Sequence, residues 1–154
     1  GAVVFKGGQK GITKDVDTNE QLEYKSNLED FLGKTMRFLN RLDSKNDLFK
    51  ELESKFTKAM KLALQLIPLG GFRLPSVSGK RRPINMAFFE SFSYLLSNLT
   101  GDEEQLKDKI KQVYRDLMGE TQYIDTLTHS VDSGLQTEER YEIINKYIGK
   151  LNLC

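Results

Sequence analysis

Four basic side chains in one interval are the residues whose chemistry is least explained by packing. Arg73, Lys80, Arg81 and Arg82 lie between residues 63 and 89, an interval that contains no Asp or Glu. The chain has 23 basic and 22 acidic residues, so the remainder has 19 basic against 22 acidic, a balance of −3. Clustered cations on a long loop can contact phosphates, and four such contacts give a salt slope of at most about four times 0.9. We therefore predict these four residues to bind nucleic acid, weakly and without sequence preference.

The same cations also have a structural interpretation. Basic loop residues are commonly solvated, in which case Phe72 would plug the core and Arg73 would pack its stem and cap carbonyls of the preceding helix. Contact with a protein partner is a third interpretation. The sequence leaves these three alternatives open.

Two other patterns suggest chemistry less strongly. The string SVSGKR resembles the end of a phosphate loop, but Leu74 stands where the motif needs Gly and Arg81 where it needs Ser or Thr. Asp125 and His129 are four residues apart, which places a carboxylate and an imidazole on one helical face, as in a general base with its orienting group. No nucleophile is tied to that pair by spacing, so a surface pair is the favoured interpretation and we expect no catalytic residue.

Composition excludes several classes of protein. One cysteine, Cys154, rules out an intrachain disulfide, and one histidine rules out a Cys/His zinc site, so we expect neither metal nor cofactor. No stretch approaches the roughly 18 apolar residues of a membrane span, and the N-terminus lacks the apolar core of a secretory signal. We expect a cytoplasmic protein without a membrane partner.

Apolar residues recur at intervals of three and four from residue 26 onward, which predicts an all-α fold. Six helices are expected, with the third apolar on most sides and therefore central in a bundle. Their expected ranges are 27–42, 44–67, 84–99, 100–119, 123–131 and 137–151. The stripes that we expect to face the core on the first two helices are Leu28, Phe31, Leu32, Met36, Leu39 and Leu42, and Phe49, Leu52, Phe56, Met60, Ala63 and Ile67.

Helix start signals and the N-terminal composition set the expected boundaries. Ser26, Ser44 and Thr100 are predicted to cap three helices, and Pro83 to lie in the first turn of the third. Residues 1–25 form a separate segment, because the first 21 residues contain four of the twelve glycines and no helical spacing. This segment is either an extended piece or hairpin around Gly7-Gly8, or a tag remnant plus linker. The helical bundle domain is then 26–154.

The strings LEDFLGKTMRFLNRL, FTKAMKLALQLI, FRLP, KRRPINMAFFESFSYLLSNL and TLTHSVDSGLQTEERYEIINKYI carry a family resemblance. Over residues 26 to 150 the chain resembles the C-terminal helical part of the ParB/sulfiredoxin-like, GmrSD-type restriction and phage-defence proteins. The most specific piece is Arg82-Pro83-Ile84-Asn85 followed by Phe88 or Phe89. That family carries an Asp-Gly-Gln-Gln-Arg motif in its N-terminal domain and, in some members, a His-Asn-His nuclease. Neither motif occurs in this chain.

The resemblance implies a recurrent structural corner and a partner. The corner comprises Phe72, Arg73, Arg82, Asn85 and Phe88. Asn85 can bond backbone groups of the preceding loop, and Arg73 can pair with loop carbonyls or with Glu90. The implied partner is the parent protein's N-terminal domain or a partner subunit.

The sequence therefore supports a non-catalytic helical accessory domain of a nucleotide-dependent restriction or phage-defence protein, which contacts DNA through its basic loop. The alternative is a protein-interaction module that packs on a missing N-terminal domain or partner subunit. An enzyme would require Asp125 and His129 to point into a pocket.

Overall fold

A computed structural model of the chain describes residues 27–43, 46–76 and 78–152. Within these ranges every regular element is helical, which confirms the predicted all-α fold. The possible hairpin at residues 1–25 and the C-terminal Cys154 lie outside them. The elements are α1 (Leu28–Arg41), α2 (Asp47–Ala63), the 3-10 helix η1 (Leu64–Leu69), α3 (Met86–Asn98), α4 (Glu103–Gly119), α5 (Thr121–Thr128) and α6 (Gly134–Asn152).

Asparagine and aspartate, rather than the expected serine and threonine, begin the helices. The expected caps Ser26 and Ser44 lie outside the described residues. Thr100 does not begin α4 but donates its hydroxyl to Oδ1 of Asn152 over 3.0 Å. Asn and Asp rank above Thr as caps, because their side-chain oxygen reaches the free N–H groups of the first turn more readily. The observed N-caps of α1 to α4 are Asn27, Asn46, Asn85 and Asp102.

Several predicted boundaries were wrong by about one turn; the second helix, expected over 44–67, is α-helical only over Asp47–Ala63. Pro83 precedes α3 instead of lying in its first turn, because Asn85 is extended and takes the N-cap position. The fifth helix ends at Thr128 rather than residue 131, and the sixth begins at Gly134 rather than residue 137. Ser130 lies between them with a φ of 46°, a left-handed conformation that interrupts a helix.

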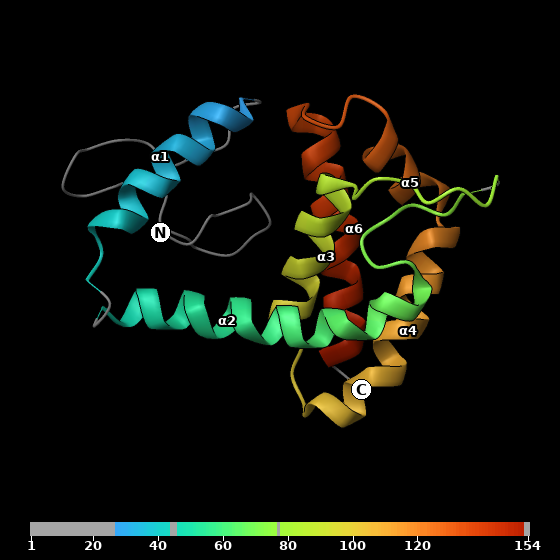
Figure 1. Cartoon of the computed structure of the whole chain (residues 1–154), viewed down its shortest axis with the longest axis horizontal. Coiled ribbons are helices and arrows are strands. Elements are labelled where there is room, and N and C mark those ends of the chain that lie inside the picture. The colour runs from blue at the N-terminus through green and yellow to red at the C-terminus, as the bar shows by residue number, and fades with distance from the viewer. Residues whose placement is uncertain (1–26, 44–45, 77, 153–154) are drawn as a thin grey trace.

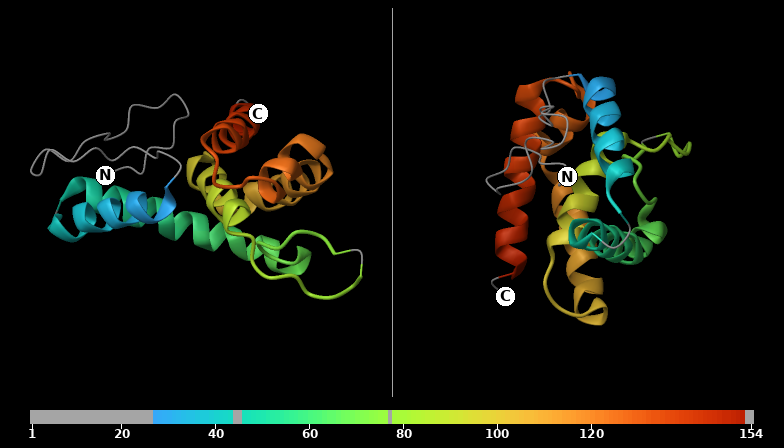
Figure 2. Two further views of the ribbon diagram at one scale, coloured as in Figure 1. Left: turned by 90° about the horizontal axis from the view of Figure 1, so that it is seen from above. Right: turned by 90° about the vertical axis from the view of Figure 1, so that its left-hand side faces the viewer.

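Helix α3 is the centre of the bundle, as its apolar composition predicted (Figures 1 and 2). It packs against α2 and α6, while α5 packs against both α4 and α6. Phe88 and Phe92 of α3 are fully buried and lie 5.2 Å apart between ring centroids. Tyr114 of α4 completes this ring cluster, at 6.0 Å from Phe88 and 6.5 Å from Phe92.

The first two helices bury the predicted stripes only in part, through Phe31 on α1 and Ala63 on α2. On α1 the buried side chains are Phe31, Thr35 and Phe38, whereas Leu32 and Met36 are exposed. Phe31, Thr35 and Phe38 recur at intervals of four and three, as the residues of the predicted stripe do. Spacing therefore did not distinguish the two faces of α1, because one position of the buried face is a threonine. Figure 1 shows α1 above the first half of α2, away from α3 and α6.

Only the second half of α2 lies against the bundle, and its first half projects beyond it (Figure 1). The buried face consists of Ala59, Leu62 and Ala63, and it continues with Leu66 of η1. Two alanines and two leucines thus face the core, in place of the larger aromatic residues of the predicted stripe. Phe56, predicted to be buried, is therefore 62% exposed.

Candidate functional site

The basic loop is the connection between η1 and α3, residues 70–85, which we call the strap. It leaves η1 through Gly70 and Gly71, whose φ angles of 100° and 65° favour glycine. The N–H of Gly71 donates to the carbonyl of Leu66 over 2.7 Å and closes the end of η1. The chain therefore turns sharply away from the bundle at a defined position.

The structure brings Phe72, Asn85 and Phe88 together where the two ends of the strap meet. The N–H of Asn85 donates to the carbonyl of Phe72 over 2.9 Å. The Phe72 ring packs edge-on against Phe88 and Phe89, with centroid distances of 5.7 and 4.9 Å. These contacts fix both ends of the strap against α3.

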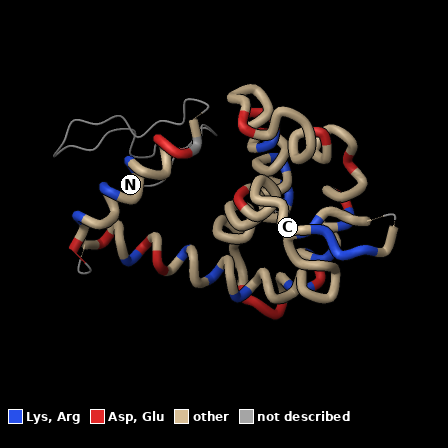
Figure 3. Tube along the Cα trace, turned by 45° about the horizontal axis from the view of Figure 1, so that its top comes forward, with Lys and Arg blue, Asp and Glu red and all other residues tan. Residues whose placement is uncertain are grey.

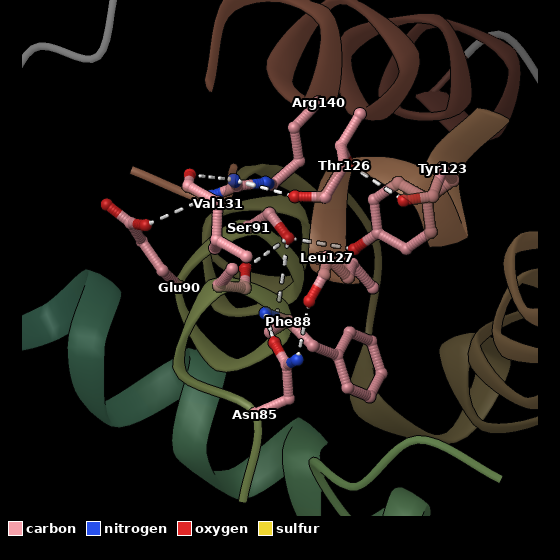
Figure 4. Close-up of polar contacts among 10 residues, drawn as sticks. Asn85, Phe88, Glu90, Ser91, Tyr123, Thr126, Leu127, Val131 and Arg140 are labelled. Atoms are coloured by element: carbon pink, nitrogen blue, oxygen red, sulfur yellow. Dashed lines mark hydrogen bonds and ion pairs between the residues drawn. The ribbon is translucent and has the colours of Figure 1, made fainter. Parts of the chain in front are cut away.

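Asn85 uses both ends of its amide (Figure 4). Its Oδ1 accepts the N–H of Phe88 over 2.8 Å, and its Nδ2 donates to the carbonyl of Leu127 over 2.9 Å. One side chain thus caps α3, ends the strap and ties α3 to α5.

Arg73 lies at this fixed end and is half-buried. Its Nη1 donates to the carbonyl of Gly70 over 3.4 Å, one of the two partners expected from the sequence. The other expected partner, Glu90, is paired with Arg140 instead. The side chain of Arg73 therefore bonds within the strap, to the carbonyl of Gly70.

Lys80, Arg81 and Arg82 are exposed in the outer part of the strap (Figure 3). Among the described residues, none of the three makes a hydrogen bond or ion pair. By contrast, some exposed lysines on the helices pair with acids one turn away, as Lys55 does with Glu51 over 2.7 Å. The strap thus presents three cations without an acidic partner among the described residues. Arg73 differs from them, because it is half-buried and bonded to Gly70.

The Asp125–His129 pair lies on open surface. Oδ1 of Asp125 and Nδ1 of His129 are 3.7 Å apart, and the two side chains are 59% and 76% exposed. The imidazole nitrogen also lies 3.0 Å from the hydroxyl of its neighbour Thr128. The pair does not enclose a substrate, and the enzyme hypothesis loses its candidate base.

The main polar feature that the sequence did not indicate is Arg140, which is only 2% exposed (Figure 4). Its Nη2 donates to the carbonyls of Thr126 and Val131 over 2.9 and 2.7 Å. Its Nη1 lies 3.7 Å from Oε2 of Glu90 on α3. Arg140 therefore holds the α5–α6 turn against the central helix. In the sequence it follows two glutamates, so it resembles a residue of the polar face.

Burial and charge act in opposite directions on Glu90. Removal from water raises the pKa of this carboxyl above its usual value of 4.5, while Arg140 and a hydrogen bond from Tyr141 lower it. Asp132 adds a smaller upward effect, and the pKa remains raised. Burial therefore disfavours the ionised form of Glu90 by more than Arg140 stabilises it.

A second buried polar contact joins α3 to α5. The hydroxyls of Ser91 and Tyr123 lie 2.8 Å apart, and Ser91 also donates to the carbonyl of Ala87 over 2.7 Å. Burial raises the pKa of Tyr123 well above its ordinary value. These hydroxyls are fully buried and neither contacts an imidazole, so they bind helices together rather than activate a nucleophile. In the described part of the chain, no cluster of three or more His, Cys, Asp or Glu could hold a metal.

Comparison with known proteins gave no match: no family model matches the sequence, and no similar curated protein or solved structure was found. The resemblance to the GmrSD-type family therefore stays a prediction. None of the helices described is both long and apolar enough to cross a membrane.

Two substitutions of Asn85 separate its two contacts. Asn85→Ala loses both the cap and the bond to Leu127, so the free energy of unfolding should fall by about 2 kcal/mol. Asn85→Ser keeps a capping oxygen and should cost only about 1 kcal/mol. Urea denaturation followed by circular dichroism measures both. Equal losses would show that the capping bond to the N–H of Phe88 contributes nothing, and an unchanged stability of Asn85→Ser would show the same for the bond to Leu127.

Glu90→Gln should change how stability depends on pH. A raised folded pKa means that the native state binds this proton more tightly than the unfolded chain does. The wild type should therefore lose stability, relative to Glu90→Gln, as pH rises from the unfolded value of 4.5 through the folded pKa. Thermal unfolding across that range tests this, with Glu104→Gln as an exposed control. A wild type that gains stability over Glu90→Gln in this window would contradict the raised pKa.

Proposed function

We propose that this chain is a non-catalytic helical accessory domain that acts by binding, and that the strap contacts the phosphates of a polyanion. The observation that carries the proposal is the exposure of Lys80, Arg81 and Arg82 without an acidic partner among the described residues. DNA is the polyanion that the family resemblance favours. The parent would be a nucleotide-dependent restriction or phage-defence protein.

The fixed ends of the strap support this proposal. A free loop loses conformational entropy when it binds, whereas the strap is already held by Phe72 and Asn85. Three long cationic side chains on an anchored loop can reach successive phosphates without displacing an internal acid. Such contacts position a backbone and carry no sequence information.

A protein-interaction module is the second candidate. The observation that favours it is the exposure of Leu32 and Met36 on α1, which lies away from α3 and α6 (Figure 1). Large exposed apolar groups mark surfaces that pack on another domain or subunit. Sedimentation velocity over a range of concentrations separates the candidates, because a strictly monomeric chain would count against a self-associating face.

The DNA proposal predicts a shallow salt dependence. A labelled short duplex should bind at low salt, with a slope of log K against log salt no steeper than about −3.6, because at most four cations contribute about 0.9 each. Replacing Lys80, Arg81 and Arg82 by Gln should remove most of the binding. Fluorescence anisotropy at several salt concentrations measures both quantities.

The matched control removes the same charge elsewhere. Lys34, Lys107 and Lys111 each pair with an acid on their own helix, so their replacement by Gln should leave DNA binding nearly unchanged. No binding at low salt, or equal losses in the two triple variants, would refute a phosphate-binding role for the strap.

A further inference from the structure

The strap belongs to a longer stretch of chain in which cations and exposed apolar side chains occur together. Residues 54–89 contain seven Lys or Arg and no Asp or Glu. Of the eight large apolar residues that are exposed in the described part of the chain, five fall within this stretch. They are Phe56, Leu64, Ile67, Ile84 and Met86.

Three of these exposed side chains, together with the half-buried Met60, lie along one flank of α2 and η1. Phe56, Met60, Leu64 and Ile67 follow one another at helical spacings of four, four and three, and we call them the apolar stripe. Phe56, Leu64 and Ile67 are 62%, 59% and 65% exposed, and Met60 is half-buried. The core-facing flank is made by the smaller set described above, so this helix carries a second apolar surface, of which Met60 alone packs in part against the core.

Basic residues lie close to the apolar stripe in the sequence. Lys61 is exposed one residue after Met60, and the strap follows η1 directly. The left view of Figure 2 shows α2, η1 and the strap along one side of the molecule, with α4 and α6 on the other. Figure 3 shows the basic segment at the end of this side.

We propose that this side binds the surface of an anionic lipid bilayer. A helix that lies in the membrane interface places Phe and Leu at the boundary of headgroups and acyl chains, and Lys and Arg at the lipid phosphates. The apolar stripe supplies the first set, and Lys61 with Lys80, Arg81 and Arg82 supplies the second. The absence of acids over this stretch matches the negative charge of such a surface.

The exposed apolar side chains favour lipid over DNA as the partner of the whole side. A phosphate backbone offers no apolar environment for Leu64 or Ile67. The cations of the strap would suffice for contacts with DNA, so DNA binding would leave the apolar stripe in water. A helix in the plane of the interface also needs no membrane-spanning length. The lack of a spanning segment, which led us to expect no membrane partner, therefore does not bear on surface binding.

The proposal extends the proposed function, because it shares the phosphate contacts of the strap and adds the apolar stripe. Each cation close to an anionic surface strengthens binding by about fivefold at moderate salt. Cations alone would give binding that high salt abolishes. Insertion of the stripe adds a contribution that salt does not screen.

The chain has no tryptophan, so Phe56→Trp introduces a single reporter into the stripe. With vesicles of equal parts phosphatidylcholine and phosphatidylserine, its emission should shift to the blue as the ring leaves water. With pure phosphatidylcholine the emission should not shift. Co-sedimentation of the unmodified chain should show at least about tenfold stronger binding to the anionic vesicles.

Variants assign the binding to residues. Replacing Phe56, Leu64 and Ile67 by Ser should weaken vesicle binding at least about tenfold, because apolar burial is lost. The same replacement at Leu32, Met36 and Leu135, which are also exposed, is the matched control and should bind as the wild type does. Circular dichroism verifies that both variants fold.

Failure of this inference differs from failure of the proposed function. The inference is refuted if anionic vesicles do not bind, if the stripe variant binds as well as the wild type, or if the control variant loses as much. The stripe variant should still bind duplex DNA, since the strap is intact. Binding of vesicles without binding of DNA would refute DNA as the strap's partner and leave the lipid proposal standing.

Discussion

The burial of α3 is the constraint on which the rest of the structure depends. Its inward-facing side chains Phe88, Phe92, Leu95 and Leu96 reach zero exposure because α2 covers one side, α6 covers another, and Tyr114 of α4 closes the ring cluster. A helix this apolar has no stable alternative to complete enclosure. Its neighbours are therefore placed by the need to cover it, and the connections between them follow.

The position of the strap is a consequence of that enclosure. Because the start of α3 is fixed, Asn85 is fixed, and its bonds hold the end of the strap and the α5 carbonyl at once. Phe72 docks on the same helix from the other end of the strap. The contacts of Phe72 and Asn85 with α3 thus determine where the exposed cations between them lie, although none of these cations is part of the core.

Arg140 shows how a polar group can support such a core. Its two backbone carbonyl partners lie in α5 and in the turn that follows, and its carboxylate partner lies on α3. Removing it would leave the buried carbonyl of Thr126 without this donor, which costs more than the pair itself contributes. The result is a defined register between α3, α5 and α6, rather than a gain in stability from the ion pair alone.

The sequence was sufficient to predict the helices and the central place of α3, because apolar spacing and composition determine both. It was insufficient for the faces of α1 and α2, since Thr35 and the small Ala59 carry no strong hydrophobic signal although they face inward. The corner residues Phe72, Asn85 and Phe88 do lie together as expected. Arg140 could not be found, because only tertiary contacts distinguish it from the charged residues around it.

Hydrogen exchange of the backbone amides measures how rarely α3 opens within the bundle. If enclosure of α3 holds the molecule together, the amides in the middle of α3, around Phe92, should exchange only through global unfolding and be the slowest in the chain. The N–H of Asn85 should be protected while the outer strap is not. Exchange in α3 as fast as in α1 would contradict the account, because the enclosed helix would then open without unfolding of its neighbours.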